Sequence, residues 1–196
     1  ELQKTGYQNA HYLPFCADIQ KDAVYPTKSY KYNVSFIGSY EPTRYQEREK
    51  ILSQLKDLDL HIWGNKAWRS TSLKDHYHSY ATKEEVHQIH RDSKIVLGMH
   101  VFGIGGTGIN VRPFDITGDG GFLLNHDERK DIFNLFEDGK EFVSFQGQSD
   151  IREKTQYYLA HDEEREQIAQ AGFERTRRDH TYLDRIATIL EIIGLS

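Results

Sequence analysis

The sequence has little cysteine, no long apolar run and no excess of positive charge. A single cysteine, Cys16, excludes a disulfide within the chain and argues against a cysteine-based zinc site. The same scarcity fits a reducing, cytoplasmic setting. No apolar run approaches the ~20 residues needed to cross a bilayer, so we expect no transmembrane segment. The net charge of −5 weighs against a dedicated nucleic-acid binder, which usually shows a basic face.

The residues that are abundant are those of an ordinary globular domain. The chain has 196 residues, 37% of them hydrophobic, and its ten Phe and twelve Tyr are enough for a sizeable core. Charged residues of both signs make up 28%, as on most folded surfaces. The first residue is Glu1 rather than methionine, so we take the chain as a fragment of a longer protein.

Apolar strand patterns alternate with helix patterns along most of the chain. The run 94–99 is almost continuously apolar, as expected of a parallel strand buried on both faces. Capping-box spacing marks three helix starts, at Thr43, Thr82 and Thr181. Alternating strands and helices predict an α/β fold with a doubly wound parallel sheet and C-terminal helices. Strands are expected at 32–37, 58–63, 94–99, 121–124 and 141–145, and helices after Thr43, after Thr82, and at 110–118, 128–137, 149–160, 162–178 and 181–193.

Ligands of such sheets bind beyond the carboxyl ends of the strands. The segments there are Gly38-Ser39-Tyr40, Trp63-Gly64-Asn65, His100 through Arg112, and Asn125-His126. The third is the richest, because its glycines let the backbone approach a ligand and Arg112 offers a fork suited to phosphate. Asp115 lies one turn further and is placed to accept hydrogen bonds from two ribose hydroxyls. A Gly-rich surface loop before a capped helix is the purely structural alternative.

Other patterns point elsewhere and are weaker. Gly103, Gly105 and Gly108, with Asp127 downstream, spell a dinucleotide fingerprint, which keeps an NAD-type binder open. That fingerprint belongs to the first strand–helix turn, whereas two such units precede it here. The pair at 57 and 59 forms a D-x-D, but it lies at the wrong edge of the sheet for a metal site, so we expect a solvated turn. His87 and His90 are expected to be solvated on a polar helix face.

Short motifs then follow one another in a fixed order over about residues 12–193. They are Val34 through Tyr40, Ile62-Trp63-Gly64, Tyr77 through Tyr80, Ser93 through Leu97, Gly108 through Asp115, Gly120 through Leu124, Tyr157 through His161, Ala171-Gly172 and His180-Thr181-Tyr182. This series resembles the C-terminal domain of the CgeB-like, spore-maturation-type glycosyltransferases (family 1-like).

The resemblance implies the Rossmann-like C-terminal half of the GT-B architecture. In that architecture this half binds the nucleotide diphosphate sugar, and a separate N-terminal domain binds the acceptor. Residues 1–30 would then be the linker from that acceptor domain, 31–178 the nucleotide-sugar-binding domain, and 179–196 a helix crossing back. The implied activity is sugar transfer without a bound metal or other cofactor, with UDP-type donors slightly favoured, and this fragment alone is expected to be inactive.

The resemblance also implies roles for residues by position. Asp115 matches the ribose carboxylate, and Arg112 and Asn110 match the phosphate end. The first loop supplies Gly38, Ser39 and Arg44, the third strand's end supplies His100, and the base side matches Trp63, Gly64, Asn65 and Tyr80. The catalytic residue is left unassigned. Asp115 stands where the family has Glu, and Thr107 where related enzymes carry a second Glu, which slightly favours the alternative of a non-catalytic nucleotide-binding or partner-binding module.

Overall fold

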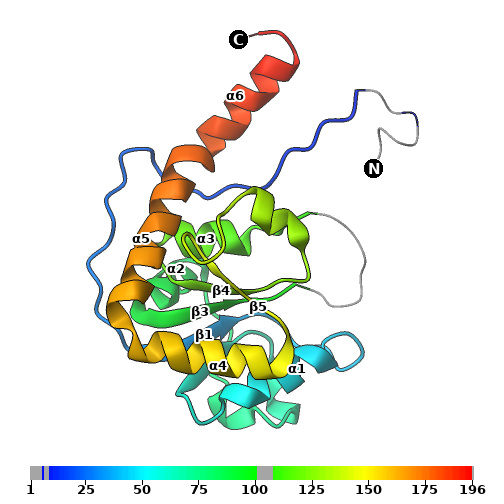
Figure 1. Cartoon of the computed structure of the whole chain (residues 1–196). Helices are drawn as coiled ribbons and strands as arrows, with labels where there is room; N and C mark the ends of the chain where they lie inside the picture. Colours follow the sequence, from blue (N-terminus) through cyan, green and yellow to red (C-terminus); the bar gives the residue numbers. More distant parts are fainter. Residues whose placement is uncertain (1–5, 7–8, 101–107, 196) are drawn as a thin grey trace.

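The computed structural model describes residues 6, 9–100 and 108–195, and its centre is one parallel sheet of five strands in the order β2-β1-β3-β4-β5 (Figure 1). The prediction of a doubly wound α/β fold is therefore confirmed. The chain moves outward from β1 to β2 and then returns to β3 on the other side of β1, so a switch point lies between β1 and β3. The strands are β1 (Tyr32–Ile37), β2 (Leu60–Trp63), β3 (Ser93–Gly98), β4 (Leu123–His126) and β5 (Val143–Phe145).

Helices cover both faces of the sheet because successive side chains of each strand point to opposite sides. Val34, Phe36 and Leu97 pack under α1 (Gln46–Leu52) and α4 (Gly147–Ala160) on one face. On the other face, Val96 and Leu123 pack against α3 (Arg112–Gly118), and Trp63 packs against α2 (Lys83–Asp92). The helix α5 (Asp162–Asp179) lies against α3 and α4. Short 3-10 turns are η2 (Ser53–Leu55), η3 (Lys66–Ser70), η4 (Lys74–His76) and η5 (Lys130–Asn134).

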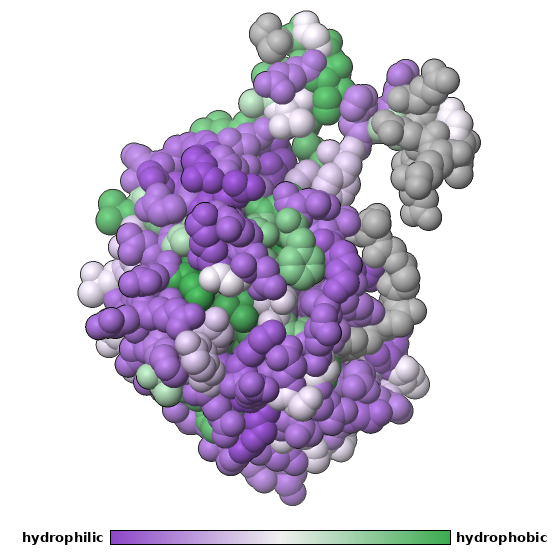
Figure 2. Space-filling view, in the orientation of Figure 1, coloured by the Kyte–Doolittle hydropathy of each residue, from purple (hydrophilic) through white to green (hydrophobic). Residues whose placement is uncertain are grey.

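The last helix, α6 (Tyr182–Ile192), projects from the body of the molecule (Figure 1). Figure 2 shows apolar side chains gathered over it. Those that are exposed are Tyr182, Leu183, Ile186, Ile189, Leu190 and Ile192, followed by Ile193 and Leu195. Within the described ranges, no helix is long and apolar enough to cross a membrane.

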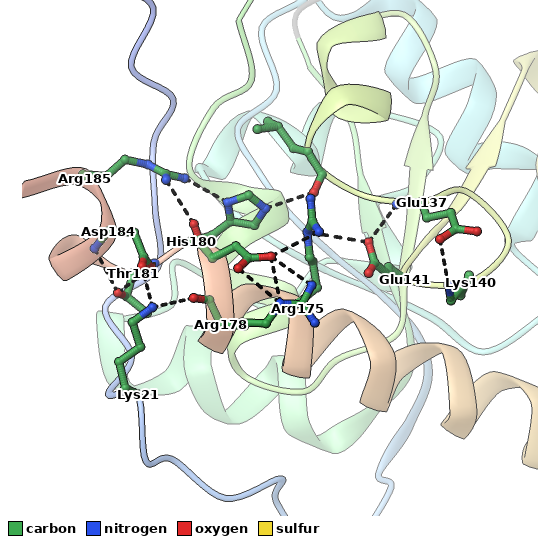
Figure 3. A network of polar contacts seen from close by, with 12 residues as sticks. Lys21, Glu137, Lys140, Glu141, Arg175, Arg178, His180, Thr181, Asp184 and Arg185 are labelled. Atoms are coloured by element: carbon green, nitrogen blue, oxygen red, sulfur yellow. Dashed lines mark hydrogen bonds and ion pairs between the residues drawn. The ribbon is translucent and has the colours of Figure 1, made fainter. Parts of the chain in front are cut away.

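The segment before β1 is fastened to the junction between α5 and α6, as Figure 3 shows for part of it. Ala17 forms a bridge with Thr181, and the Lys21 ammonium pairs with Asp184. Arg185 donates to the carbonyl oxygens of Pro14 (2.9 Å) and Phe15 (3.0 Å). Residues far apart in the sequence therefore form one side of the molecule.

Two of the three predicted capping boxes form. Thr82 with Glu85 and Thr181 with Asp184 make both reciprocal bonds. The box predicted at Thr43 is wrong, because α1 begins at Gln46 and the Thr43 hydroxyl instead donates to the Glu41 carboxylate at 3.0 Å.

The helix predicted at 128–137 is also wrong, since only the 3-10 turn η5 forms there. Ile132, Leu135 and Phe136 keep the helical spacing of buried residues. The next amide, that of Glu137, donates to the Glu141 side chain at 2.8 Å, so the helical ladder is not continued.

Candidate functional site

The loops that follow β1 and β3 meet at the switch point of the sheet, and Arg48 joins them. Arg48 belongs to α1 and is 4% exposed. Its Nη1 donates to the Ser39 carbonyl after β1 (2.6 Å), and its Nη2 donates to the His100 carbonyl after β3 (3.2 Å). One guanidinium therefore spans the place where the doubly wound fold usually binds its ligand.

Arg112, the first residue of α3, brings a second guanidinium to the same place. Its Nη1 donates to the Met99 carbonyl at 2.5 Å. Both guanidinium groups lie over the ring of Phe36, Arg48 at 5.2 Å and Arg112 at 5.8 Å from the ring centroid. Two like charges thus share one apolar surface.

Acidic side chains balance the charge of this pair only in part, because Asp115 acts on Arg112 from beyond ion-pair distance. Neither arginine makes an ion pair within residues 9–100 or 108–195, and the Nε of Arg48 is buried without a hydrogen-bond partner there. Burial, and then the charge of Arg112, lowers the pKa of Arg48 to about 10. Burial likewise lowers the pKa of Arg112. An anion with several oxygens would supply the partners that these groups lack.

His100 lies close to the two arginines, whose charges act on its ring. It is 6% exposed, and burial together with the nearby charge of Arg112 lowers its pKa to about 4. The ring is therefore neutral at pH 7 and adds no third positive charge. The switch point therefore holds two buried guanidinium groups and a neutral imidazole, a combination that favours binding of an anion.

Two glycines allow the loops to approach each other. A Cβ on Gly38 would lie 2.7 Å from Cζ of Phe36 and 3.5 Å from Nη2 of Arg112. A Cβ on Gly64 would lie 2.2 Å from the carbonyl oxygen of Gly38. Gly64 therefore has a packing role that any larger residue would disturb.

Asn65 and Asn110, both expected in the site, have side chains that brace the backbone. Asn65 accepts from the Tyr40 amide (3.0 Å) and donates to the Tyr40 carbonyl (2.9 Å), which fixes the loop after β1. Asn110 accepts from the amide of Arg112 at 3.2 Å and so holds the start of α3.

The other expected residues lie around this centre. Trp63 is 7% exposed and stacks on His78 with ring centroids 4.5 Å apart. Tyr80 is exposed. Arg44 is exposed too, and its guanidinium lies 4.0 Å from the Glu41 carboxylate. Arg44 thus lies outside the cluster that Arg48 and Arg112 form.

Asp115 lies beside this centre, in a groove between α2 and α3. It lines a cavity of about 260 Å³ and an adjoining one of about 280 Å³. Burial raises the pKa of its carboxyl group. The first cavity is lined by Cys16, Asp18, Lys83, Val86, His87, Val111, Asp115 and Tyr182.

Sequence reasoning missed Arg48, although a signal was present. Arg48 shares the helical face of Ile51, Leu52 and Leu55, all of which are fully buried. A charge in an apolar stripe indicates a buried role. The expectation of solvated histidines on α2 is wrong, because His90 is 3% exposed and His87 bonds to Asp119.

The dinucleotide pattern receives no support from the described residues. Gly103 and Gly105, like Thr107, lie outside them. Asp127, the expected ribose ligand of that pattern, instead accepts hydrogen bonds from Lys130 and Gln146. The D-x-D pair also has partners within the protein, because Asp57 pairs with Arg152 of α4 and Asp59 with His61 of β2.

Known proteins share this fold and parts of this sequence. The chain is 26% identical to the spore protein CgeB of Bacillus subtilis (strain 168) over 212 residues, which cover 99% of this chain and 64% of CgeB. The crystal structure of TarM has 13% identity and a TM-score of 0.63, covering 88% of this chain and 38% of TarM. Anabaena HepE, in a complex with UDP and glucose, has 9% identity and a TM-score of 0.66, covering 83% of this chain and 48% of HepE.

The chain thus spans less than two thirds of CgeB and less than half of the two structures. At these identities the structures establish the fold alone, which is that of GT-B glycosyltransferases. The family comparison reaches further, because it matches residues 44–191, which hold Arg48, Arg112 and Asp115. On this match, the chain belongs to the family of glycosyl transferase-like proteins.

Proposed function

We propose that this chain is the donor-binding domain of a glycosyltransferase and that Arg48 and Arg112 hold the diphosphate of its nucleotide sugar. The observation that carries the proposal is the pair of buried guanidinium groups at the switch point, with no carboxylate paired to them in the described part of the chain. Charges buried in this way cost free energy unless a partner is supplied. A diphosphate supplies that partner.

The remaining parts of the donor follow from this position. Asp115 lines a cavity beside this position, where its carboxylate can accept a hydrogen bond from the ribose of the nucleotide. Gly38, Ser39 and His100 then border the diphosphate and the sugar. As the leaving diphosphate gains charge, fixed guanidinium groups stabilise it more than they stabilise the bound donor, which lowers the barrier to transfer.

The donor, the acceptor and the setting belong to the same proposal. UDP is the first nucleotide to try, because HepE was crystallised with UDP and glucose. Residues 1–30 would link this domain to an acceptor-binding domain, and 179–196 would cross back to it with the apolar side of α6. We further propose that transfer needs no bound metal and that the setting is cytoplasmic, as the sequence predicts.

Calorimetry with UDP, pyrophosphate and uridine tests the proposal. Arg48→Gln and Arg112→Gln should each weaken UDP and pyrophosphate by ~1.5–3 kcal/mol, the usual range for a hydrogen bond to a charged group. Neither should affect uridine much. Arg44→Gln, in the same segment but exposed, is the matched control and should change nothing. Equal affinity of wild type and both variants for pyrophosphate would disprove the phosphate site.

A further inference from the structure

Asp119, the residue that follows α3, contacts three side chains of α2 through its carboxylate. Nδ1 of His87 lies 3.0 Å and 2.8 Å from its two carboxylate oxygens. Nδ1 of His90 lies 2.8 Å away, and Nη1 of Arg91 lies 3.3 Å away. The Asp119 side chain is 10% exposed, so these bonds are largely shielded from water.

These bonds set the hydrogen positions of the His87 ring. A carboxylate only accepts, so the ring nitrogen that faces Asp119 carries the hydrogen. In the neutral ring the other nitrogen, Nε2, is then an acceptor. No residue within the described part of the chain is bonded to Nε2 of His87, so this atom is left for a ligand.

The cavities that the His87 ring lines indicate which part of a ligand it would contact. His87 lines both cavities that Asp115 lines, whereas His90 is 3% exposed and lines neither. Of the two histidines on Asp119, only His87 therefore reaches the space beside Asp115. Lys83 of α2 and Asp18 of the N-terminal segment are the other charged groups on the first cavity.

We infer that His87 is a second ligand for the ribose of the bound nucleotide, facing Asp115 across the groove, and that Asp119 is its positioning residue. The inference rests on the proposed function. A ribose carries two neighbouring hydroxyl groups, each of which can donate one hydrogen bond. Asp115 on α3 and His87 on α2 line the same two cavities, so the carboxylate and Nε2 can each accept from one hydroxyl.

Nucleotide analogues test this inference directly. The full chain is titrated with UDP, its 2′-deoxy and 3′-deoxy analogues, and pyrophosphate. Wild type should bind UDP better than either analogue. His87→Ala should weaken UDP by about tenfold, the value of one net hydrogen bond, and should remove the discrimination against one analogue. Pyrophosphate affinity should stay the same.

His90→Leu is the matched control, because it removes a bond to the same carboxylate at a residue that does not line the cavity. It should lower the melting temperature and leave the discrimination intact. A ¹⁵N spectrum of the histidines gives a readout that a purely structural role would not move. The ¹⁵N signal of His87 Nε2 should shift when UDP is added, and Asp119→Asn should disturb the tautomer that has its hydrogen on Nδ1.

The outcomes separate this inference from the proposed function. If His87→Ala lowers stability but binds UDP and both analogues as wild type does, His87 only ties α2 to α3 and the inference is overturned. If wild type binds pyrophosphate and UDP with equal affinity, the proposed anion site is retained, but the inference that His87 binds the ribose is overturned. If wild type binds none of them, both proposals fail.

Discussion

Arg48 and Arg112 are held where charge is costly. Moving a guanidinium from water to an apolar surface without an acid beside it is unfavourable, and here two of them face one phenylalanine ring. Main-chain carbonyls of Ser39, Met99 and His100 offset part of that cost. The positive charge that remains uncompensated favours anion binding at the switch point. The same charge lowers the stability of the protein when no anion is bound.

His100 should make stability depend on pH. Its folded pKa of about 4 lies below the ordinary value of 6.5 because of burial and then the neighbouring arginine charge. Between these two pH values the unfolded chain binds a proton that the folded chain does not, so the free energy of unfolding should fall as pH falls through this window. One group contributes at most about 1.4 kcal/mol per pH unit. Denaturant titrations of wild type and His100→Gln at several pH values measure it.

The difference between the two proteins is the informative quantity, because burial also lowers the pKa of His126 and His180. The variant should show a smaller slope from pH 6.5 down to 4. Identical slopes in the two proteins would mean that His100 is not kept neutral by its surroundings.

The helices α1 and α2 begin with the same type of sequence signal, yet only one of the two caps forms. Thr82 accepts from the Glu85 amide, and the Glu85 side chain accepts from the Thr82 amide at 2.7 Å. At the start of α1, the chain makes a further turn before the helix begins at Gln46. The Thr43 hydroxyl therefore donates to the Glu41 carboxylate and does not cap the helix.

Substitution should therefore distinguish the two threonines. Thr82→Ala should lower the free energy of unfolding by about 1 kcal/mol, the usual cost of losing an N-cap. Thr43→Ala should stay within about 0.5 kcal/mol of wild type, as exposed substitutions do. Urea denaturation followed by circular dichroism measures both, and equal losses would contradict the structure of one of these helix starts.

The elements that were predictable are those whose signal is local. The strand at 32–37 carries its period in its own residues, and α6 carries both its period and its cap, which Thr181 forms with Asp184. The predicted helix at 128–137 does not continue past η5, because the Glu137 amide bonds to the Glu141 side chain four residues further on, and the spacing of apolar residues does not reveal such a bond. In the candidate site, Arg112 and Asp115 were recognisable by their place after a strand, whereas Arg48 comes from a helix face and required the packing to be known.

The molecule is closed by a contact between its two ends. Arg185 of α6 bonds to the backbone of residues 14 and 15, while Cys16 and Asp18 of the same segment line the cavity beside Asp115. Arg185→Ala should therefore cost ~1–2 kcal/mol of stability and also weaken uridine binding a few-fold. Arg178→Ala is the control, because among the described residues that side chain pairs with neighbouring Asp179 alone. Thermal melts measure the stability and calorimetry measures uridine binding. Loss of stability with unchanged uridine binding would show that residues 14–18 do not contribute to the site.

Binding and transfer should separate at the level of the whole protein. The chain covers 64% of the CgeB sequence, and in our proposal the acceptor is bound elsewhere. Residues 1–196 should bind UDP but show no sugar transfer to added acceptors, whereas a protein carrying the further domain should show both. Turnover by residues 1–196 alone would contradict the proposed division. UDP binding without transfer by the longer protein would favour the non-catalytic alternative.

The fastening of residues 14–21 to α6 also has a consequence for the order in which the chain folds. The bond from Arg185 to Pro14 joins positions 171 apart, and closing a loop of that length costs roughly 4.5 kcal/mol of chain entropy. The sheet can assemble from shorter-range pairings, so the two ends should join after it and come apart before it. Amide hydrogen exchange would then show the ends opening as one cooperative unit while β1 and β3 stay protected.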